Sequence, residues 1–152
     1  MSPRRLPLLA MLAVIAALAA VGCADPAEAD DPIRAGRTVY GDSCSACHGA
    51  RGQGGVGPSL EEVVIDFPAC SDQQKWIRLG SDRWLTEVGA TYGATGKPVN
   101  GGMPAHDRLG DDQIATVALY ERVEFGGEDK ARAFADCGFT GTGDGAVPGS
   151  DS

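Results

Sequence analysis

The segment Cys44-Ser45-Ala46-Cys47-His48 constrains the fold of this chain more than any other part of its 152 residues. Two cysteines separated by two residues and followed directly by a histidine form the pattern for covalent attachment of haem c. Each thiol can add to one vinyl group of the porphyrin, and the imidazole of His48 can then bind the iron. The chain is therefore predicted to fold around one covalently attached haem c.

Two other interpretations of the motif require a different context. A thioredoxin-like dithiol lies at a strand-to-helix turn in an α/β domain, whereas this motif lies between a predicted helix and a glycine-rich loop. A zinc site requires a further pair of Cys or His ligands at metal spacing. The remaining candidates, Cys70, His106 and Cys137, are scattered along the chain. Haem attachment is favoured over both alternatives.

Met103 is the predicted second iron ligand. It lies in the segment Asn100-Gly101-Gly102-Met103-Pro104, far enough along the chain to reach the other face of a haem held by His48. Methionines that fill a core usually lie on apolar helix faces rather than between two glycines and a proline. His106 is the alternative ligand, and two histidine ligands would lower the reduction potential. Because an acidic and a basic residue follow it directly, His106 is expected at the surface.

Residues 1–22 have the features of a secretory signal peptide. Two arginines precede an uncharged apolar run that is short for a membrane-spanning helix. Cys23 follows this run and resembles the lipidated cysteine of bacterial lipoproteins, which becomes the new N-terminus. Cleavage before Asp25 and retention of the run as an anchor are the alternatives. Lipidation of Cys23 would tether the exported protein to the membrane.

Loss of the leader makes an acidic chain more acidic. The whole sequence carries 13 Lys+Arg and 21 Asp+Glu, a net charge of −8. Cleavage before Cys23 removes two arginines and no acid, which leaves 11 basic residues against 21 acidic ones, a net charge of −10. This charge disfavours nucleic acid as a partner and favours redox proteins with a basic docking face. Solubility after export is an equally good explanation of the same charge.

The rest of the sequence indicates one predominantly helical domain, because no long stretch alternates with the period of a strand and no repeat is present. The domain is predicted over residues 32–137, after a tether over residues 23–31 and before a disordered tail over residues 138–152. Helices are expected at about residues 31–42, 72–79, 82–89 and 110–125. Gly80 marks the break between the middle two.

The order of these motifs resembles the class I cytochrome c family over residues 32–125. The resemblance rests on Gly36 and Tyr40, Cys44–Gly49, Gly57-Pro58-Ser59-Leu60, Gly102-Met103-Pro104-Ala105 and Leu109–Ile114. It implies an all-α cytochrome c fold, with several helices wrapped around one haem. The span between the attachment motif and the methionine is long, and Gly110 stands where serine or threonine is common.

The resemblance also implies particular contacts. The first and last helices should cross, with Gly36 and Tyr40 against Val117 and Tyr120. The backbone carbonyl of Pro58 should accept a hydrogen bond from the ring of His48, which orients the ligand and raises its basicity.

The cysteine count leaves one pair to explain. Two of the five cysteines are assigned to haem and Cys23 to lipid, so Cys70 and Cys137 remain. Disulfides persist in exported proteins, which makes a Cys70–Cys137 bond the prediction and two buried thiols the alternative.

The predicted function is single-electron transfer between redox proteins, without turnover of a substrate, in the periplasm or at the outer face of the cytoplasmic membrane. One alternative is a cytochrome subunit of a larger membrane-associated oxidoreductase. The other is a haem enzyme or gas sensor, which needs an open sixth position that Met103 would fill. Trp76, Trp84 and Tyr92 are candidates to line the haem pocket, and at least one tryptophan is expected against the haem.

Overall fold

The computed structural model describes residues 31–139. The predicted signal peptide, Cys23, most of the tether and residues 140–152 lie outside the described residues. Within them the elements run in the order α3 (Pro32–Ser43), α4 (Ser45–His48), α5 (Val63–Asp66), α6 (Cys70–Glu87), β1 (Thr91–Tyr92), β2 (Lys97–Pro98), α7 (Asp111–Glu124) and α8 (Lys130–Asp136). The described domain is mostly helical, as the sequence predicted. In this range no helix is both long and apolar enough to cross a membrane.

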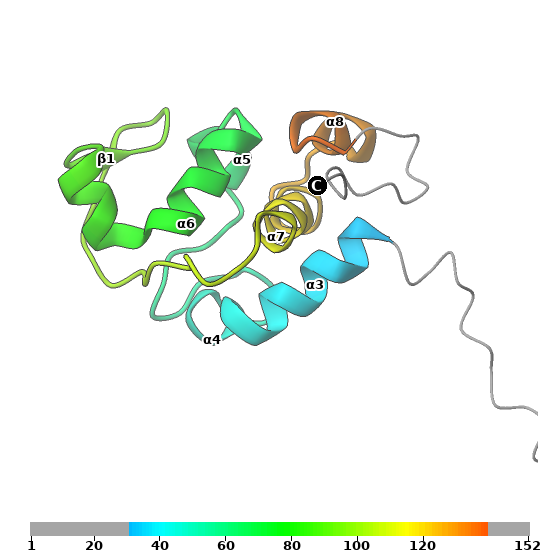
Figure 1. Cartoon of the computed structure of the whole chain (residues 1–152), viewed down its shortest axis with the longest axis horizontal. Coiled ribbons are helices and arrows are strands. Elements are labelled where there is room, and N and C mark those ends of the chain that lie inside the picture. The colour runs from blue at the N-terminus through cyan, green and yellow to red at the C-terminus, as the bar shows by residue number, and fades with distance from the viewer. Residues whose placement is uncertain (1–30, 140–152) are drawn as a thin grey trace, which may run out of the picture.

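The first helix begins where its capping residues predict. The carboxylate of Asp31 accepts a hydrogen bond from the backbone N–H of Ile33 at 3.0 Å, and Pro32 occupies the first helical position. Gly36, Val39 and Tyr40 form the buried face of α3. This face packs against α7, which Figure 1 shows at the centre of the molecule with α3 below it and α8 above it.

The crossing of α3 and α7 depends on a glycine. A Cβ atom on Gly36 would lie 2.0 Å from the carbonyl oxygen of Thr116 and 2.8 Å from Cβ of Tyr120, so only glycine allows this approach. One turn later the ring of Tyr40 lies 5.6 Å from that of Tyr120 and 4.9 Å from that of Phe125, measured between centroids. The crossing and the Tyr40–Tyr120 contact are confirmed. The backbone that such a Cβ would meet belongs to Thr116, next to the expected Val117.

The two middle helices form one element, α6, with a sharp kink. Gly80 has φ 63° and ψ −177° inside Cys70–Glu87, a conformation that L residues rarely adopt. The predicted break at Gly80 is therefore confirmed, and the first half of α6 begins two residues earlier than predicted. At the other helix, α7, the side chain of Gln113 accepts a hydrogen bond from the N–H of Gly110 at 3.0 Å, while Gly110 has no side chain to cap the helix in turn.

Five short elements were not predicted: α4, α5, the two-residue strands β1 and β2, and α8. The strands pair antiparallel, with Thr91 opposite Pro98 and Tyr92 opposite Lys97. Helix α8 begins after Asp129, whose carboxylate accepts a hydrogen bond from the N–H of Arg132. Phe139, inside the segment expected to be a tail, is 3% exposed and packs its ring 5.8 Å from that of Phe134. Packing therefore continues to the end of the described residues.

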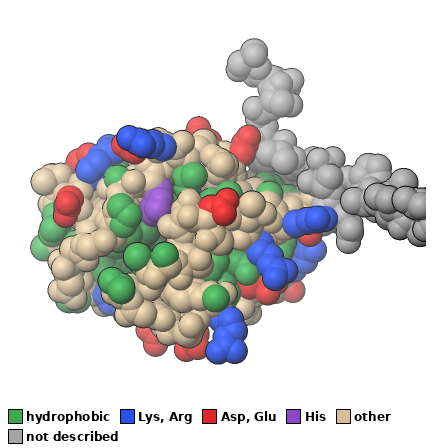
Figure 2. Space-filling model, turned by 90° about the horizontal axis from the view of Figure 1, so that it is seen from below, with side chains coloured by type: hydrophobic (Ala, Val, Ile, Leu, Met, Phe, Trp, Pro, Cys, Tyr) green, Lys and Arg blue, Asp and Glu red, His purple; other side chains and the backbone are tan. Residues whose placement is uncertain are grey.

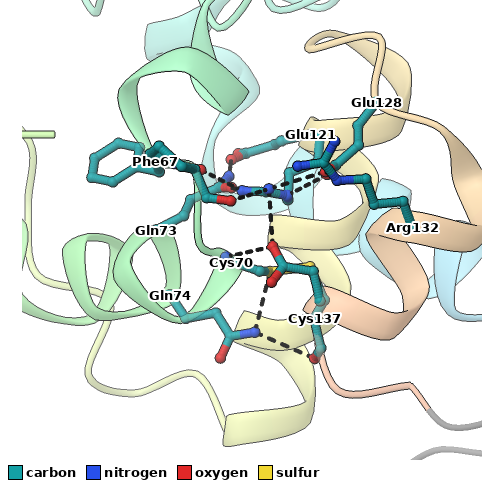
Figure 3. The surroundings of a disulfide bond; sticks show 11 residues. Phe67, Cys70, Gln73, Gln74, Glu121, Glu128, Arg132 and Cys137 are labelled. Atoms are coloured by element: carbon teal, nitrogen blue, oxygen red, sulfur yellow. Dashed lines mark hydrogen bonds and ion pairs between the residues drawn. A yellow bond between two sulfur atoms is a disulfide. The ribbon is translucent and has the colours of Figure 1, made fainter. Parts of the chain in front are cut away.

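The disulfide predicted from the cysteine count is present. It joins Cys70 at the start of α6 to Cys137 at the end of α8, 67 residues apart in the chain (Figure 3). The carboxylate of Asp136 accepts a hydrogen bond from the N–H of Cys70 at 2.8 Å. The disulfide and this hydrogen bond hold α8 against the start of α6.

Arg122 of α7 is fully buried beside the disulfide and satisfies its charge with several groups. Its guanidinium lies 2.6 Å from Glu128 and 3.0 Å from Asp136. It also donates to the backbone carbonyls of Phe67 at 2.7 Å and Pro68 at 3.1 Å. Because a buried charge is costly without partners, this network fixes α7 against α8 and the loop before α6.

Candidate functional site

A cavity of about 360 Å³ lies among α4, α6, the loop over residues 56–60 and the loop over residues 100–106. Its walls bring together the predicted site residues Cys44, Cys47, His48, Pro58 and Met103, and also His106. Residues separated by more than fifty positions in the sequence thus face one space. Figure 2 shows one face of the molecule, on which hydrophobic side chains gather around a histidine while most charged side chains lie toward the edges.

Both thiols of the motif reach this cavity from a single helical turn. The N–H of His48 bonds the carbonyl of Cys44 at 3.0 Å, and the N–H of Cys47 bonds the same carbonyl at 3.1 Å. Residues three apart on a helix share a face, so Cys44 and Cys47 lie side by side. Both are free cysteines, Cys44 buried and Cys47 half-buried. Two such thiols on one wall suit attachment of a ligand at two points.

The ring of His48 is held by the loop that follows. Its Nδ1 lies 2.9 Å from the carbonyl oxygen of Pro58, as the family resemblance implied. When Nδ1 donates to this carbonyl, Nε2 keeps the free lone pair that a metal requires. A Cβ on Gly57 would lie only 3.0 Å from Cε1 of the ring, so glycine at this position allows the loop to pass close to the imidazole.

Met103 reaches the cavity from a loop that is anchored to the kink of α6. The N–H of Ser81 donates to the carbonyl of Met103 at 2.9 Å, and the hydroxyl of Ser81 accepts from the N–H of Met103 at 3.1 Å. A Cβ on Gly80 would lie 2.5 Å from backbone atoms of Pro104 and Ala105. The kink at Gly80 therefore makes room for the methionine loop. Nothing local in the sequence indicates the contact of Ser81 with Met103.

His106 is less exposed than its charged neighbours suggested. It is half-buried and lines the same cavity. Its backbone N–H donates a hydrogen bond to the backbone carbonyl of Ile77 at 3.2 Å. Burial, and to a smaller extent the nearby His48, lower the pKa of its imidazole. His106 is thus a neutral side chain at the cavity wall near neutral pH.

The pKa of Cys44 and the side chains around the motif bear on its two alternative interpretations, a redox dithiol and a zinc site. Burial, followed by the charges of Glu121 and Cys47, raises the pKa of Cys44 to about 12. A thiol with such a pKa is a poor thiolate nucleophile, unlike the low-pKa cysteine of a disulfide oxidoreductase. No group of three or more His, Cys, Asp or Glu side chains placed to hold a metal ion occurs among residues 31–139. The raised pKa of Cys44 therefore argues against a redox dithiol.

Aromatic side chains form another wall of the cavity. Phe67, Trp76 and Tyr92 line it, and the rings of Trp76 and Tyr92 stack with centroids 4.4 Å apart. Trp84 does not line the cavity but packs edge-on against Trp76 at 5.1 Å. Of the two tryptophans, Trp76 is thus the one at the expected haem position. A flat, aromatic and largely apolar wall suits a porphyrin.

Two buried polar residues of the cavity wall were not expected from the sequence. Glu121 of α7 and Gln73 of α6 both line the cavity, and the amide of Gln73 donates to the carboxylate of Glu121 at 2.9 Å. The two residues are 48 positions apart in the sequence. Because the helical pattern contains no sign of this contact, it predicts Glu121 to be an ordinary surface glutamate.

The donor set fits a haem c: two free thiols one helical turn apart, an oriented imidazole and a methionine from a separate loop. Comparison with known proteins gives the same assignment. The family model described as cytochrome c matches residues 33–120. Over 90 residues the chain is 38% identical to the Cbb3-type cytochrome c oxidase subunit CcoP of Azospirillum brasilense, an alignment that covers 56% of this chain and 28% of that protein. The chain thus spans less than a third of the length of that relative. No solved structure gives a significant match. Because the family model covers more than half of the sequence, this chain belongs to the cytochrome c family.

Proposed function

We propose that this chain carries single electrons on one haem c, attached through thioether bonds to Cys44 and Cys47, with iron bound by Nε2 of His48 and the sulfur of Met103. The observation that supports this assignment best is the arrival of all four side chains at one cavity. Membership of the cytochrome c family implies the covalent haem and the role of electron carrier. The bound group supplies a one-electron couple, and a histidine–methionine ligand pair raises its potential.

The residues of the chain hold and orient this group. Cys44 and Cys47 prevent its loss, and the carbonyl of Pro58 fixes the imidazole of His48. Ser81 holds both backbone polar groups of Met103, so the methionine loop is placed before ligation. A ligand set that is already in place changes little between oxidation states, which favours fast electron exchange.

Spectra of the oxidised and reduced protein test the ligand assignment. The expected result is the weak near-infrared band that sulfur ligation gives ferric haem, lost in Met103→Ala and retained in His106→Gln. Loss of the band in neither variant, or in the histidine variant alone, would contradict ligation by Met103. Rapid binding of carbon monoxide to the ferrous wild-type protein would instead favour the haem enzyme or gas sensor.

A second candidate, a cytochrome subunit of a membrane-associated oxidase, is favoured by the relative from Azospirillum brasilense, itself a cbb3-type oxidase subunit. Lipidation of Cys23 would keep the domain at the membrane surface where such a complex resides. Export of wild-type and Cys23→Ser protein followed by membrane fractionation tests the tether. The wild type is expected with membranes and the variant in the soluble exported fraction, and the same distribution for both would exclude the lipid anchor. Purification of a tagged chain with or without oxidase subunits then separates a free carrier from a subunit.

The docking face is proposed to surround the rim of the cavity. Val56 lines the cavity and is 94% exposed, so an apolar side chain projects where a haem edge would approach a partner. Acidic residues outnumber basic ones in this chain, so the partner is proposed to present basic side chains around an apolar centre.

A further inference from the structure

Glu121 is an acidic residue buried in the wall of the cavity. It is 5% exposed. Among the described residues, the only hydrogen-bond partner of its carboxylate is Gln73, itself 1% exposed, whose amide donates at 2.9 Å (Figure 3). A carboxylate removed from water is costly unless a positive charge compensates it. The protonation state of Glu121 therefore depends on the charge inside the cavity.

No cation of the described residues pairs with Glu121. The neighbouring guanidinium of Arg122 forms its ion pairs with Glu128 at 2.6 Å and Asp136 at 3.0 Å, and it meets Glu121 only through Gln73, whose amide oxygen accepts from it at 3.3 Å. Burial raises the pKa of Glu121 to about 8, and the hydrogen bond from Gln73 opposes this rise only in part. Near neutral pH the side chain is therefore mostly the neutral acid.

The ionisable groups that face Glu121 from its own helix and from α3 titrate far from neutral pH. Burial, with a contribution from Glu121 itself, raises the pKa of Tyr40 to about 12 and also raises the pKa of Tyr120. Cys44, between α3 and α4, also faces Glu121, and its thiol is consumed when the thioether forms. From α6 the facing group is Gln73, which does not ionise.

Most other ionisable side chains of the cavity wall are paired or assigned, and burial raises the pKa of Tyr92, which moves it away from neutral pH. Lys97 lies 2.8 Å from Asp66 in an ion pair, and the hydroxyl of Thr95 donates to the same carboxylate. His48 is the proposed iron ligand. His106 remains as the second group that can exchange a proton near the cavity, and burial lowers its pKa from the ordinary value of 6.5. The pKa of Glu121 is raised and that of His106 is lowered, so the two groups titrate in different pH ranges.

We propose that Glu121 is a proton-binding site coupled to the redox state of the haem, so that this cytochrome exchanges a proton together with its electron. The inference rests on the proposed haem attachment. When one electron leaves the ferrous protein for a redox partner, the cavity gains one positive charge, which favours the carboxylate. The O–H bond of Glu121 then breaks and the proton passes to solvent. Reduction returns one electron to the iron and one proton to Glu121.

The test is the reduction potential of the haem-loaded protein as a function of pH. In the wild type the potential is expected to fall as the pH rises through the neutral and mildly alkaline range. One proton per electron corresponds to a tenfold change in the equilibrium for each pH unit, or about 59 mV for a one-electron couple. Glu121→Gln mimics the neutral acid. Its potential should therefore stay constant across this range, at the value that the wild type reaches at low pH.

Two matched variants identify the group. Glu124→Gln removes an exposed glutamate from the same helix, and His106→Gln removes the other candidate; both should retain the wild-type slope. A slope that persists in Glu121→Gln, or disappears in His106→Gln, would overturn the inference. In the wild type, infrared difference spectra between redox states should show a carboxylic-acid carbonyl band that is lost on oxidation. Its absence would overturn the inference without use of any variant.

The outcomes also separate this inference from the proposed function. Failure to attach haem at Cys44 and Cys47 would contradict the proposed function itself. A protein with attached haem, a near-infrared sulfur band and a potential independent of pH would leave the electron carrier intact and refute only the role of Glu121.

Discussion

Ser81 binds Met103 at both of its backbone polar groups, donating its own N–H to the carbonyl and accepting the N–H on its hydroxyl. Ser81 is 2% exposed and follows the kink at Gly80, so the bond between helix and loop is shielded from water. One end of the proposed iron coordination therefore depends on a serine that does not touch the metal.

Ser81→Ala is expected to loosen the methionine loop without unfolding the domain. Loss of the hydroxyl leaves the N–H of Met103 unpaired, a cost of about 1 kcal/mol. The near-infrared sulfur band should then disappear at a lower denaturant concentration than helical circular dichroism does, whereas the two transitions should lie closer together in the wild type. Thr86→Ala, which removes an exposed hydroxyl from the same helix, is the control and should leave both transitions unchanged. Equal transitions in Ser81→Ala and Thr86→Ala would show that the serine does not hold the loop.

Gly36→Ala should strongly destabilise the domain. The added Cβ would lie 2.0 Å from the carbonyl oxygen of Thr116, a backbone atom that cannot move alone, and overpacking of this kind costs about 3 kcal/mol. Gly41→Ala, on the same helix with no atom within 4 Å of the new Cβ, should stabilise the protein by roughly 0.5–1 kcal/mol. Denaturant unfolding of both variants measures the difference. Equal stability of the two would argue against the close crossing of α3 and α7.

Arg122→Met tests the buried network beside the disulfide. Removing one member of a buried ion pair leaves Glu128 without its nearest cation and is expected to cost about 3–5 kcal/mol. Arg132→Met removes a second arginine that pairs with Glu128 but is 73% exposed at its side chain, and should cost less than about 1 kcal/mol. A thermal unfolding series should therefore rank the two variants far apart. If they rank together, the buried network contributes no more to stability than the exposed ion pair does.

Glu121 should make stability depend on pH. In the folded protein its pKa is raised to about 8 from an ordinary value of 4.5, so the folded state binds the proton more tightly than the unfolded state. Its favourable contribution is complete below pH 4.5 and is lost as the pH rises through 8. The free energy of unfolding of the reduced protein should therefore fall across this interval, and Glu121→Gln should remove most of the fall. Glu124→Gln is the control, and an unchanged pH profile in Glu121→Gln would show that another group is responsible.

Val56→Asn should slow electron exchange without altering the haem. Val56 is 94% exposed at the cavity rim, and loss of an apolar contact worth about 1 kcal/mol would reduce the second-order rate roughly fivefold. Ile65→Asn changes another exposed apolar side chain, 62% exposed, that does not line the cavity. Stopped-flow oxidation by a small basic redox protein compares the variants. A larger effect at Ile65 than at Val56 would place the docking face elsewhere.

The parts of the structure that follow from local chemistry were predictable from the sequence. Asp31 and Pro32 mark the start of α3, and Gly80 marks the break in α6, because each acts through its own backbone and near neighbours. The attachment motif and the methionine segment are each specific patterns that follow one another in the expected order, so their meeting at one cavity was also expected.

The missed features depend on contacts between distant segments. A two-residue strand is too short to show a period, and α8 has only the capping side chain of Asp129 as a local signal. The burial of Glu121 and Arg122 depends on residues 48 to 55 positions away, at Gln73 and Phe67. From the sequence alone, Glu121 and Arg122 look like part of a solvent-exposed helix face. Only the tertiary structure shows that they are buried.

The anchoring of the methionine loop to α6 has a consequence for the order of assembly. The histidine side of the cavity closes over short chain distances, since His48 contacts Pro58 ten residues later. The methionine side requires α6 to bend at Gly80 and then to capture a loop 22 residues further on. Contacts that are local in the chain form faster than distant ones. We therefore expect a nascent chain to present its cysteines and histidine while the methionine loop is still open, which leaves an entrance for the porphyrin that closes last.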